Sequence, residues 1–325
     1  MLLVGDVGGT KTRLGLFERG HPRPLVRAAR SYATHAFGSF STIVDRFVQD
    51  VPQPLSVDAV AIAVAGPVSA HTRARLTNVP WDISIDEIGA RVGAPRARLL
   101  NDLEAMAYSI DVLTPAEIVS LQEGKADADG NAAVIAAGTG LGQALLHRVD
   151  RRYLPVASEG GHADFAARSD REMDLVRMLR NRYGRAEVEH VLSGPGLVNL
   201  HRFTHDGETC AAIRDIAVDD RPAAISESAL AHRCSRCEEA LVMFVSAYGA
   251  ESGNLALRGL ATGGVYLGGG IAPRILPALQ RGEFMRAFLD KATMADLLGR
   301  IPVKVILAPE AGLLGAALYA QNTVA

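Results

Sequence analysis

Two segments of this chain, one in each half, share one pattern: an apolar run, a turn rich in glycine and threonine, and a second apolar run. They span residues 2–17 and 132–149. The pattern predicts a β-hairpin whose glycines let backbone N–H groups approach phosphate oxygens, while threonine adds a hydroxyl donor. The alternative is an ordinary Gly-Gly hairpin turn. Because the pattern occurs twice, we expect two structurally related domains that face each other across a cleft.

The composition is that of an ordinary globular protein with room for two domains. The chain has 325 residues, of which 48% are hydrophobic and 22% charged, and its formal net charge is -2. No block of lysine and arginine stands out, so we expect no nucleic-acid partner. The sequence also lacks a window of ~18 apolar residues and a secretory signal, so we expect no membrane association. Three clustered cysteines are too few for a disulfide framework, which favours a cytoplasmic location.

The alternation of apolar periodicities predicts the α/β class, a sheet covered by helices. In the first third we expect strands at residues 2–7, 13–17, 59–64 and 98–101, and helices at 40–48, 83–92 and 103–110. Residues 113–131 are polar and broken by proline and glycine, which predicts a domain junction near residue 112. Beyond it we expect strands at 132–137, 143–149 and 303–307, and helices at 171–182, 235–260 and 312–320.

Three glycine clusters are candidates for holding a nucleotide. The first contains Asp6 and the second spans residues 138–142. Since a carboxylate repels phosphate, the partner expected for Asp6 is the Mg²⁺ that accompanies a nucleotide. The third cluster, residues 263–271, could hold adenine and ribose or could be a plain crossing from a strand to a helix ahead of Pro273. None has the spacing of a P-loop or of a dinucleotide-binding GxGxxG turn, which disfavours both of those folds.

Asp102 follows Asn101 where a buried strand meets a helix. In open α/β sheets, a carboxylate at the carboxyl end of a strand is presented to the ligand crevice. Aspartate is also a common N-cap, so Asp102 could do no more than begin the helix at 103–110. Position alone leaves both interpretations open.

A second polar group occupies glycine-rich loops in the other half. Glu159, His162 and Asp164 lie in one such loop, and Glu189 precedes another. Carboxylates and an imidazole suit a sugar, because each hydroxyl both donates and accepts hydrogen bonds. Two glutamates could also be the acid and nucleophile of a glycosidase, or simply exposed charges. The phosphate-type turns favour phosphoryl transfer over hydrolysis.

Cys234 and Cys237 form a CxxC motif. A zinc site needs about four ligands, and the sequence offers no second pair at suitable spacing, with His232 the only near candidate. We therefore interpret the motif as two thiols in a helical segment.

Six segments together resemble the bacterial glucokinase family, within the superfamily of sugar kinases, actin and chaperone ATPases. They run in the expected order from residue 5 to residue 274: GDVGGTKTRLGL, LLNDLEAMAYSI, AAGTGLGQALL, EGGHADFA, EHVLSGPGLVNLHRF and GGVYLGGGIAPR. The cysteine-rich zinc motif of the related repressor and open-reading-frame kinase family is missing, so the resemblance is to the zinc-independent branch. It implies two actin-like (ribonuclease H-like) α/β domains flanking a deep cleft. The small domain would comprise residues 1–112 and 309–325, and the large domain residues 113–308.

The resemblance implies phosphorylation of D-glucose on its 6-hydroxyl by Mg-ATP. Asp102 would be the general base, and the sugar hydroxyls would be bound by Asn101, Glu159, His162 and Glu189. Asp6 would hold Mg²⁺ through water. The nucleotide contacts implied by the resemblance are Gly5, Asp6, Gly8, Gly9, Thr10, Gly138, Thr139, Gly140, Gly268, Gly269 and Gly270. Members of this family are usually cytoplasmic homodimers.

The expected mechanism depends on one buried aspartate that takes the proton of a hexose hydroxyl while both domains hold the triphosphate. The alternatives are a kinase for fructose, mannose or N-acetylmannosamine, a non-enzymatic sugar sensor on the same fold, and an ATPase that needs no sugar. A sensor of the repressor type would need a DNA-binding extension, and here the first turn begins at residue 5.

Overall fold

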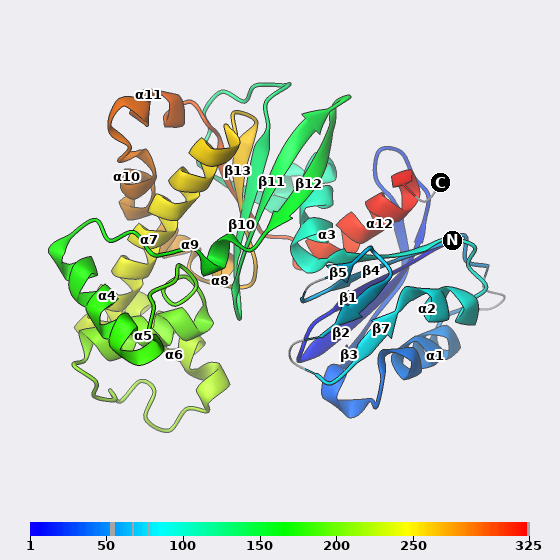
Figure 1. The fold of residues 1–325 in the computed structure, drawn as a ribbon, viewed down its shortest axis with the longest axis horizontal. Coiled ribbons are helices and arrows are strands. Elements are labelled where there is room, and N and C mark those ends of the chain that lie inside the picture. Colours follow the sequence, from blue (N-terminus) through cyan, green and yellow to red (C-terminus); the bar gives the residue numbers. More distant parts are fainter. Residues whose placement is uncertain (53–55, 67, 77–78, 324–325) are drawn as a thin grey trace. The chain divides into compact units, whose positions relative to one another are not determined.

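The computed structural model describes residues 1–52, 56–66, 68–76 and 79–323, and its contacts group the chain into two compact units (Figure 1). The first unit comprises Met1–Thr114, Arg152–Ala157 and Ala308–Ala325, and the second comprises Pro115–Arg151 and Ser158–Leu307. The predicted large domain, residues 113–308, also includes residues 152–157, which the contacts group with the first unit.

The first unit contains a five-stranded sheet of order β3-β2-β1-β4-β8. β1 pairs antiparallel with β2 and parallel with β4, and β4 pairs parallel with β8. The strands are β1 (Leu2–Val7), β2 (Lys11–Glu18), β3 (Leu25–Ala33), β4 (Ala59–Val64) and β8 (Ala97–Asn101), with a small sheet of β5 (Val68–Ser69), β6 (Arg73–Arg75) and β7 (Asp82–Ser84). The helices are α1 (Phe40–Asp50), α2 (Ile85–Arg91), α3 (Asp102–Tyr108) and α12 (Ala311–Thr323).

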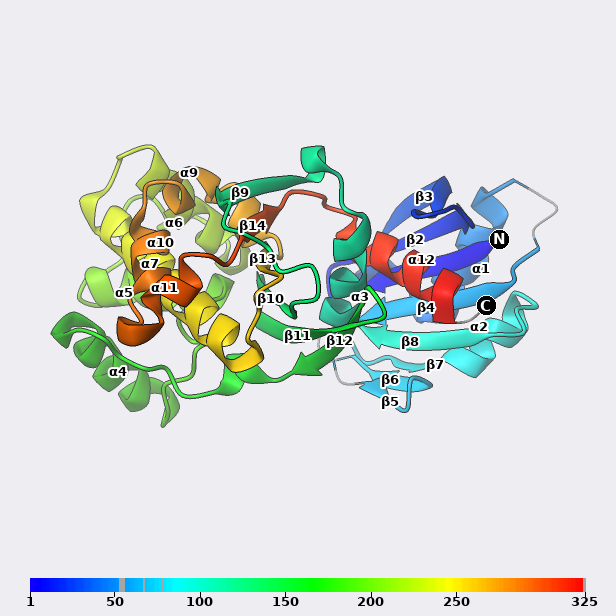
Figure 2. The ribbon, with the colours of Figure 1, turned by 90° about the horizontal axis from the view of Figure 1, so that it is seen from above.

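Both faces of the central strand β4 are buried, and on this strand the two faces carry side chains of different size. On β4, the large side chains at positions 60, 62 and 64 join a core with α1 and α2. The alanines at positions 59, 61 and 63 join a core with α12. Small side chains let a helix lie close to the sheet, and Figure 2 shows α12, in red, lying across β1, β2 and β4.

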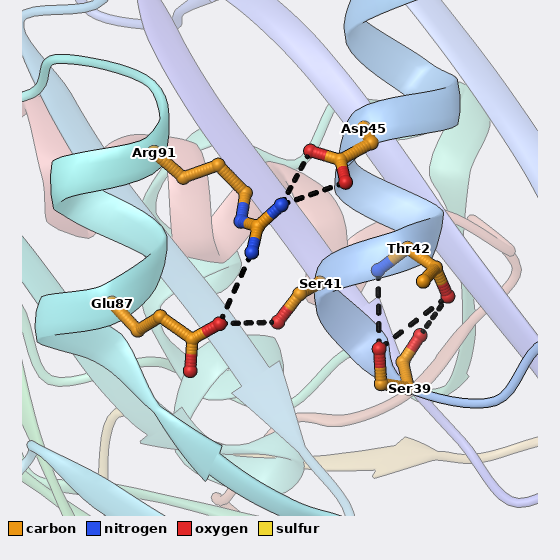
Figure 3. Close-up of polar contacts among 6 residues, drawn as sticks. All are labelled: Ser39, Ser41, Thr42, Asp45, Glu87 and Arg91. Carbon is orange, nitrogen blue, oxygen red and sulfur yellow. Dashed lines mark hydrogen bonds and ion pairs between the residues drawn. The ribbon is translucent and has the colours of Figure 1, made fainter.

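Polar contacts join α1 to α2 on the surface of the first unit (Figure 3). Arg91 on α2 contacts both carboxylate oxygens of Asp45 on α1, at 2.9 and 2.7 Å. Ser41 donates a hydrogen bond of 2.9 Å to Glu87, which also accepts one from Arg91 at 3.3 Å. Ser39 caps α1 by accepting from a backbone N–H of its first turn. Exposed ion pairs of this kind contribute little to stability, so the buried cores hold this unit together.

The second unit has a six-stranded sheet of order β12-β11-β10-β13-β14-β9, except that residues 152–157 of the edge strand β12 are grouped with the first unit. Its strands are β9 (Ile118–Gln122), β10 (Ala132–Ala137), β11 (Leu141–Val149), β12 (Arg152–Ser158), β13 (Gly264–Gly268) and β14 (Val303–Ile306). Its helices are α4 (Asp170–Tyr183), α5 (Gly194–Thr204), α6 (Arg221–Leu230), α7 (Ser235–Gly259), α8 (Ile271–Arg274), α9 (Leu276–Leu279), α10 (Glu283–Leu289) and α11 (Ala295–Leu298). The long helix α7 is mostly buried, and α5, α6 and α10 pack against it.

The two sheets share one strand arrangement, as the repeated hairpin pattern predicts. In each, the first strand pairs antiparallel with the second and parallel with a later strand: β1 with β2 and β4, and β10 with β11 and β13. A further parallel strand follows, β8 in one sheet and β14 in the other. The predicted α/β class and the two related sheets are confirmed.

Most predicted elements lie within a few residues of the observed ones, and the polar segment 113–131 is the main exception. We predicted no helix or strand there, but residues 118–122 form β9, an edge strand antiparallel to β14. All five of its residues are half-buried, so it lacks the alternation that marks a strand in sequence. The helix expected at residues 83–92 begins later, because residues 82–84 form β7.

None of the helices in the described part of the chain combines the length and apolarity that crossing a bilayer requires.

The close packing of α12 on α3 depends on Gly315, because a Cβ there would lie 1.7 Å from the carbonyl oxygen of Ala105. We expect Gly315→Ala to lower the free energy of unfolding by about 1–3 kcal/mol, since α12 must move away from α3. Denaturation in urea measures the change. Gly38→Ala is the control, since no atom lies within 4 Å of its added Cβ. Equal stability of the two variants would contradict this packing.

Candidate active site

The first glycine turn follows β1 and is held in place by Thr34. The N–H of Gly8 donates to the carbonyl of Lys11 at 3.1 Å, which closes the turn. The Thr34 hydroxyl donates to the carbonyl of Gly8 at 2.9 Å, and the Thr34 N–H donates to the carbonyl of Thr10 at 3.0 Å. In the described part of the chain, the backbone N–H groups of Gly9 and Thr10 have no hydrogen-bond partner. The turn therefore has fixed carbonyls and available donors, as an anion site needs.

Asp6 lies at the end of β1, beside this turn. Its side chain is partly buried, and within the described residues it accepts no hydrogen bond. Burial raises the pKa of Asp6, while the charge of Arg13, its neighbour across the β1–β2 pair, lowers it. A Cβ on Gly312, in the first turn of α12, would lie 3.8 Å from Asp6 Oδ2. A carboxylate with little solvation and no hydrogen-bond partner suits a hard cation such as Mg²⁺.

Gly5 belongs to the strand rather than to the turn. It is buried in β1, and an added Cβ would lie 2.8 Å from Leu14 and 2.9 Å from Ile62. Packing against these two side chains explains why glycine stands there.

The start of α3 decides between the two interpretations of Asp102. The N-cap is Asn101, whose Oδ1 accepts from the N–H groups of Leu103 and Glu104 at 3.0 and 3.4 Å. Glu104 in turn accepts from the N–H of Asn101 at 3.3 Å, completing a capping box. The Asn101 amide also donates to the carbonyl of Gly66 at 3.3 Å. The capping role that we considered for Asp102 therefore belongs to Asn101.

Asp102 is the first residue of α3, and its side chain is exposed. Our expectation of a buried aspartate is therefore wrong for this structure. The physical reason is its place on the helix, because Leu103, Ala105 and Ala107 form the buried face of α3. Asp102 Oδ1 lies 2.9 Å from the N–H of Leu103, which keeps the carboxylate near the helix N-terminus.

The second glycine turn, residues 138–140, is held by Glu189 and by the start of α5. Glu189 Oε2 accepts from the N–H of Leu141 at 2.8 Å, and a Cβ on Gly140 would lie 2.7 Å from that oxygen. The N–H of Gly194, at the start of α5, donates to the carbonyl of Gly138 at 2.8 Å. Glu189 is therefore a structural partner of this turn through one oxygen. Thr139, at the tip, is exposed.

Two more predicted sugar ligands lie near Glu189. The Glu189 N–H donates to the carbonyl of Gly161 at 2.8 Å, and Gly161 follows Glu159 and precedes His162. His162 Nδ1 lies 2.8 Å from Glu187, a residue that we did not predict. This contact raises the pKa of His162, and the charges of Glu189 and Glu159 act in the same direction. The second unit thus brings Glu159, His162 and Glu189 together.

The third glycine cluster meets the second one. β13 ends at Gly268, and Gly269 has a φ of +80°. A Cβ on Gly269 would lie 2.4 Å from the carbonyl oxygen of Ala137, the last residue of β10. Gly270 then begins α8. Residues 138–140 and 268–270 therefore lie at the same edge of the sheet, as expected for two parts of one nucleotide site.

One group of chemically active residues escaped the sequence prediction. Ligand atoms of His201, His205, Cys210 and Cys237 lie within 4.8 Å of one another. His232, our only candidate partner for the CxxC motif, instead contacts Glu238 at 2.8 Å. The signal we overlooked is the spacing of His201 and His205, which puts both imidazoles on one side of a helix.

Comparisons with known proteins agree over the whole chain. A family model described as Glucokinase matches residues 3–323. A glucokinase from Nostoc punctiforme (strain ATCC 29133 / PCC 73102) is 39% identical over 340 residues, covering 99% of each chain. The crystal structure of a glucokinase from an Antarctic psychrotroph has 31% identity and a TM-score of 0.86, covering 99% of this chain and 98% of that one. A ROK family glucokinase from Streptomyces griseus, solved with glucose and AMPPNP, has a TM-score of 0.65 at 21% identity, covers 98% of this chain and 99% of that one, and supports the fold.

The raised pKa of Asp6 has a consequence for stability. Between the unfolded and the folded pKa, the folded state keeps a proton that the unfolded state has lost, so stability falls as pH rises through this interval. The cost persists at neutral pH. We therefore expect Asp6→Asn to raise the Tm at pH 7 and to lose that advantage below the ordinary pKa of 3.8. Thermal denaturation across pH tests this.

Asp86→Asn is the matched control, because Asp86 is exposed in the first turn of α2. The negative charge of Asp86 near the N-terminus of α2 is favourable, so removing that charge should not raise the Tm. A Tm for Asp6→Asn that equals or falls below that of the wild type at neutral pH would contradict the desolvation of Asp6.

Proposed function

This chain belongs to the glucokinase family, and from that premise we propose how its residues transfer the γ-phosphoryl group of ATP to the 6-hydroxyl of D-glucose. The observation that carries the proposal is that the predicted catalytic and phosphate-binding residues lie at one edge of the first sheet. β1, β4 and β8 run parallel, so their carboxyl ends lie at one edge. Asp6 lies in β1 next to its last residue, the first glycine turn follows β1, and Asp102 follows β8.

In this proposal the first unit supplies the base and part of the phosphate site. Asp102 accepts the proton of the 6-hydroxyl, which the exposed carboxylate can reach without leaving its helix. The N–H groups of Gly9 and Thr10 donate to phosphate oxygens. Asp6 holds the hydrated Mg²⁺, which neutralises charge on the β- and γ-phosphates when bound. Asp102 is exposed in this structure, so in this proposal the bound sugar must exclude water from its carboxylate.

The second unit supplies donors and acceptors for the sugar and the nucleotide. Glu159 is exposed and can accept from sugar hydroxyls, and the second oxygen of Glu189 can do the same. His162 keeps Nε2 for the sugar, because its Nδ1 is engaged by Glu187. The turn at residues 138–140 provides the second phosphate contact, and residues 268–270 contact the adenosine. Asn101 holds the start of α3 through Oδ1, so in this proposal its sugar contact comes through the amide Nδ2.

We also propose that the protein acts in the cytoplasm as a homodimer. Its three cysteines are free, which fits a reducing compartment.

A sugar panel tests the activity. In a coupled assay of ADP release with Mg-ATP, we expect turnover with D-glucose to exceed that with fructose, mannose or N-acetylmannosamine, because a site built from paired donors and acceptors rejects a misplaced hydroxyl. ADP release that does not depend on sugar would identify an ATPase. Sugar binding without turnover would identify a sensor, and a higher kcat/KM with another hexose would change the substrate.

The role of Asp102 is tested by Asp102→Asn. We expect kcat to fall by ~10²-fold or more, with the affinity for glucose much less changed, because the variant loses a proton acceptor and keeps its shape. Steady-state kinetics and glucose titration by calorimetry separate the two effects. A turnover number near that of the wild type would remove this assignment.

Glu159→Gln is the contrasting variant. It should mainly raise the KM for glucose, since a sugar hydroxyl loses a charged acceptor. An unchanged KM would contradict the contact that we propose for Glu159.

A further inference from the structure

Five side chains outside the candidate active site form a cluster of imidazoles and thiols within the second unit. His201 lies in the last turn of α5, and His205 is the C-cap of that helix. Cys210 follows in an irregular segment, Cys234 is the N-cap of α7, and Cys237 lies in its first turn. His201, His205 and Cys237 are 2%, 4% and 0% exposed. Buried polar side chains that gather in this way need partners.

The spacing of the cluster fits tetrahedral coordination. The sulfurs of Cys210 and Cys237 are 3.8 Å apart. Two thiolates that each lie ~2.3 Å from one zinc ion at the tetrahedral angle would be separated by roughly 3.8 Å. His201 Nε2 lies 3.1 Å from Cys210 Sγ, and all four ligand atoms of the set with His205 lie within 4.8 Å of one another. A disulfide would need a much shorter sulfur–sulfur distance, about 2 Å.

The orientation of His205 is that of a metal ligand. Its Nδ1 lies 2.8 Å from the carbonyl oxygen of His201. A carbonyl can only accept, so Nδ1 carries the proton and Nε2 keeps its lone pair. In metal sites, a backbone carbonyl commonly fixes the histidine in this way. The His201 and His205 rings stack 3.8 Å apart at 15°, which aligns the two imidazoles.

We propose that His201, His205, Cys210 and Cys237 bind one Zn²⁺ as a closed structural site. Two imidazoles and two thiolates are ligands that zinc prefers. Binding forms two zinc–sulfur bonds and releases one proton from each thiol, so the site with its ion carries no net charge. That neutrality matters because these side chains are buried. Four protein ligands leave no open position for catalysis.

Cys234 lies beside this set but does not complete it. Its sulfur is 3.4 Å from His205 Nε2, and it is not among the four residues whose ligand atoms are all mutually close. The four chosen ligands fill a tetrahedral site without it.

The ion would anchor a part of the chain that has little regular structure. Between His205, the C-cap of α5, and the short helix at 218–220, residues 206–217 form only turns and irregular backbone, and Cys210 attaches them to the cluster. Cys237 belongs to α7, so the ion would tie this segment and the end of α5 to the central helix. The other end of α5 holds the second glycine turn through Gly194 and Gly138. Zinc would thus stabilise the helix that supports this turn.

The test begins with the full chain expressed with zinc and purified without a histidine tag or chelator. Elemental mass spectrometry should find about one zinc per chain. A mercurial that modifies thiols should release the zinc, and a strong chelator should lower the Tm. Refolding with Co²⁺ should produce thiolate-to-cobalt charge-transfer bands. These measurements on the wild type do not depend on the behaviour of a variant, nor on glucokinase activity.

Variants then identify the ligands. His201→Gln and Cys237→Ser should each lower zinc affinity by at least ~10-fold. Removal of a residue that only hydrogen-bonds to a metal ligand already costs about that much, and these two variants remove ligands themselves. His232→Gln is the matched control, because His232 is exposed and bonded to Glu238, and it should keep its zinc. Zinc retention by both ligand variants would overturn the assignment.

Two results on the wild type would also overturn the proposal. One is a chain that binds neither Zn²⁺ nor Co²⁺ at about one ion per molecule. The other is a single reactive thiol after denaturation without reductant, which would mean that two of the three cysteines form a disulfide in place of a metal site.

Discussion

The parallel pairing of three strands in each unit is the constraint on which the rest of this structure depends. β1, β4 and β8 run in one direction, as do β10, β13 and β14. Parallel strands carry their carboxyl ends to one edge, so segments far apart in sequence emerge side by side. The first turn and the start of α3 follow strands that end at the same edge of one sheet, and residues 138–140 meet residues 268–270 at an edge of the other. Helices on the sheet faces bury the strands that make this possible.

Each glycine turn is shaped by a group from elsewhere in the chain. Thr34 holds the carbonyls of the first turn, while Glu189 and Gly194 hold the second. A phosphate site needs donors that are already in place, because ordering them on binding would cost affinity. Glu189 therefore combines two tasks, since one oxygen fixes the turn and the other is available to a ligand. The hydrogen bond to the turn therefore fixes the position of the Glu189 side chain before any ligand binds.

Asn101 and Asp102 are neighbours in sequence but have different positions at the start of α3. Asn101 caps the helix with its Oδ1, which accepts from the N–H groups of Leu103 and Glu104, while Asp102 is the first residue of the helix. The Asp102 carboxylate lies at the N-terminus of α3, with its Oδ1 2.9 Å from the N–H of Leu103. Asp102 is exposed because the buried face of α3 lies on the other side of the helix.

The sequence by itself determined the central strands, the two turns and the α/β class. Continuous apolar runs such as residues 2–7, 59–64 and 132–137 match β1, β4 and β10, because a strand buried on both faces needs no polar residue. Only the tertiary structure decided that residues 118–122 form an edge strand and that His201 and His205 meet Cys210 and Cys237. Both outcomes depend on contacts between segments distant in the chain. The spacing of His201 and His205 indicates that these two imidazoles lie together, but local periodicity does not indicate which thiols they meet.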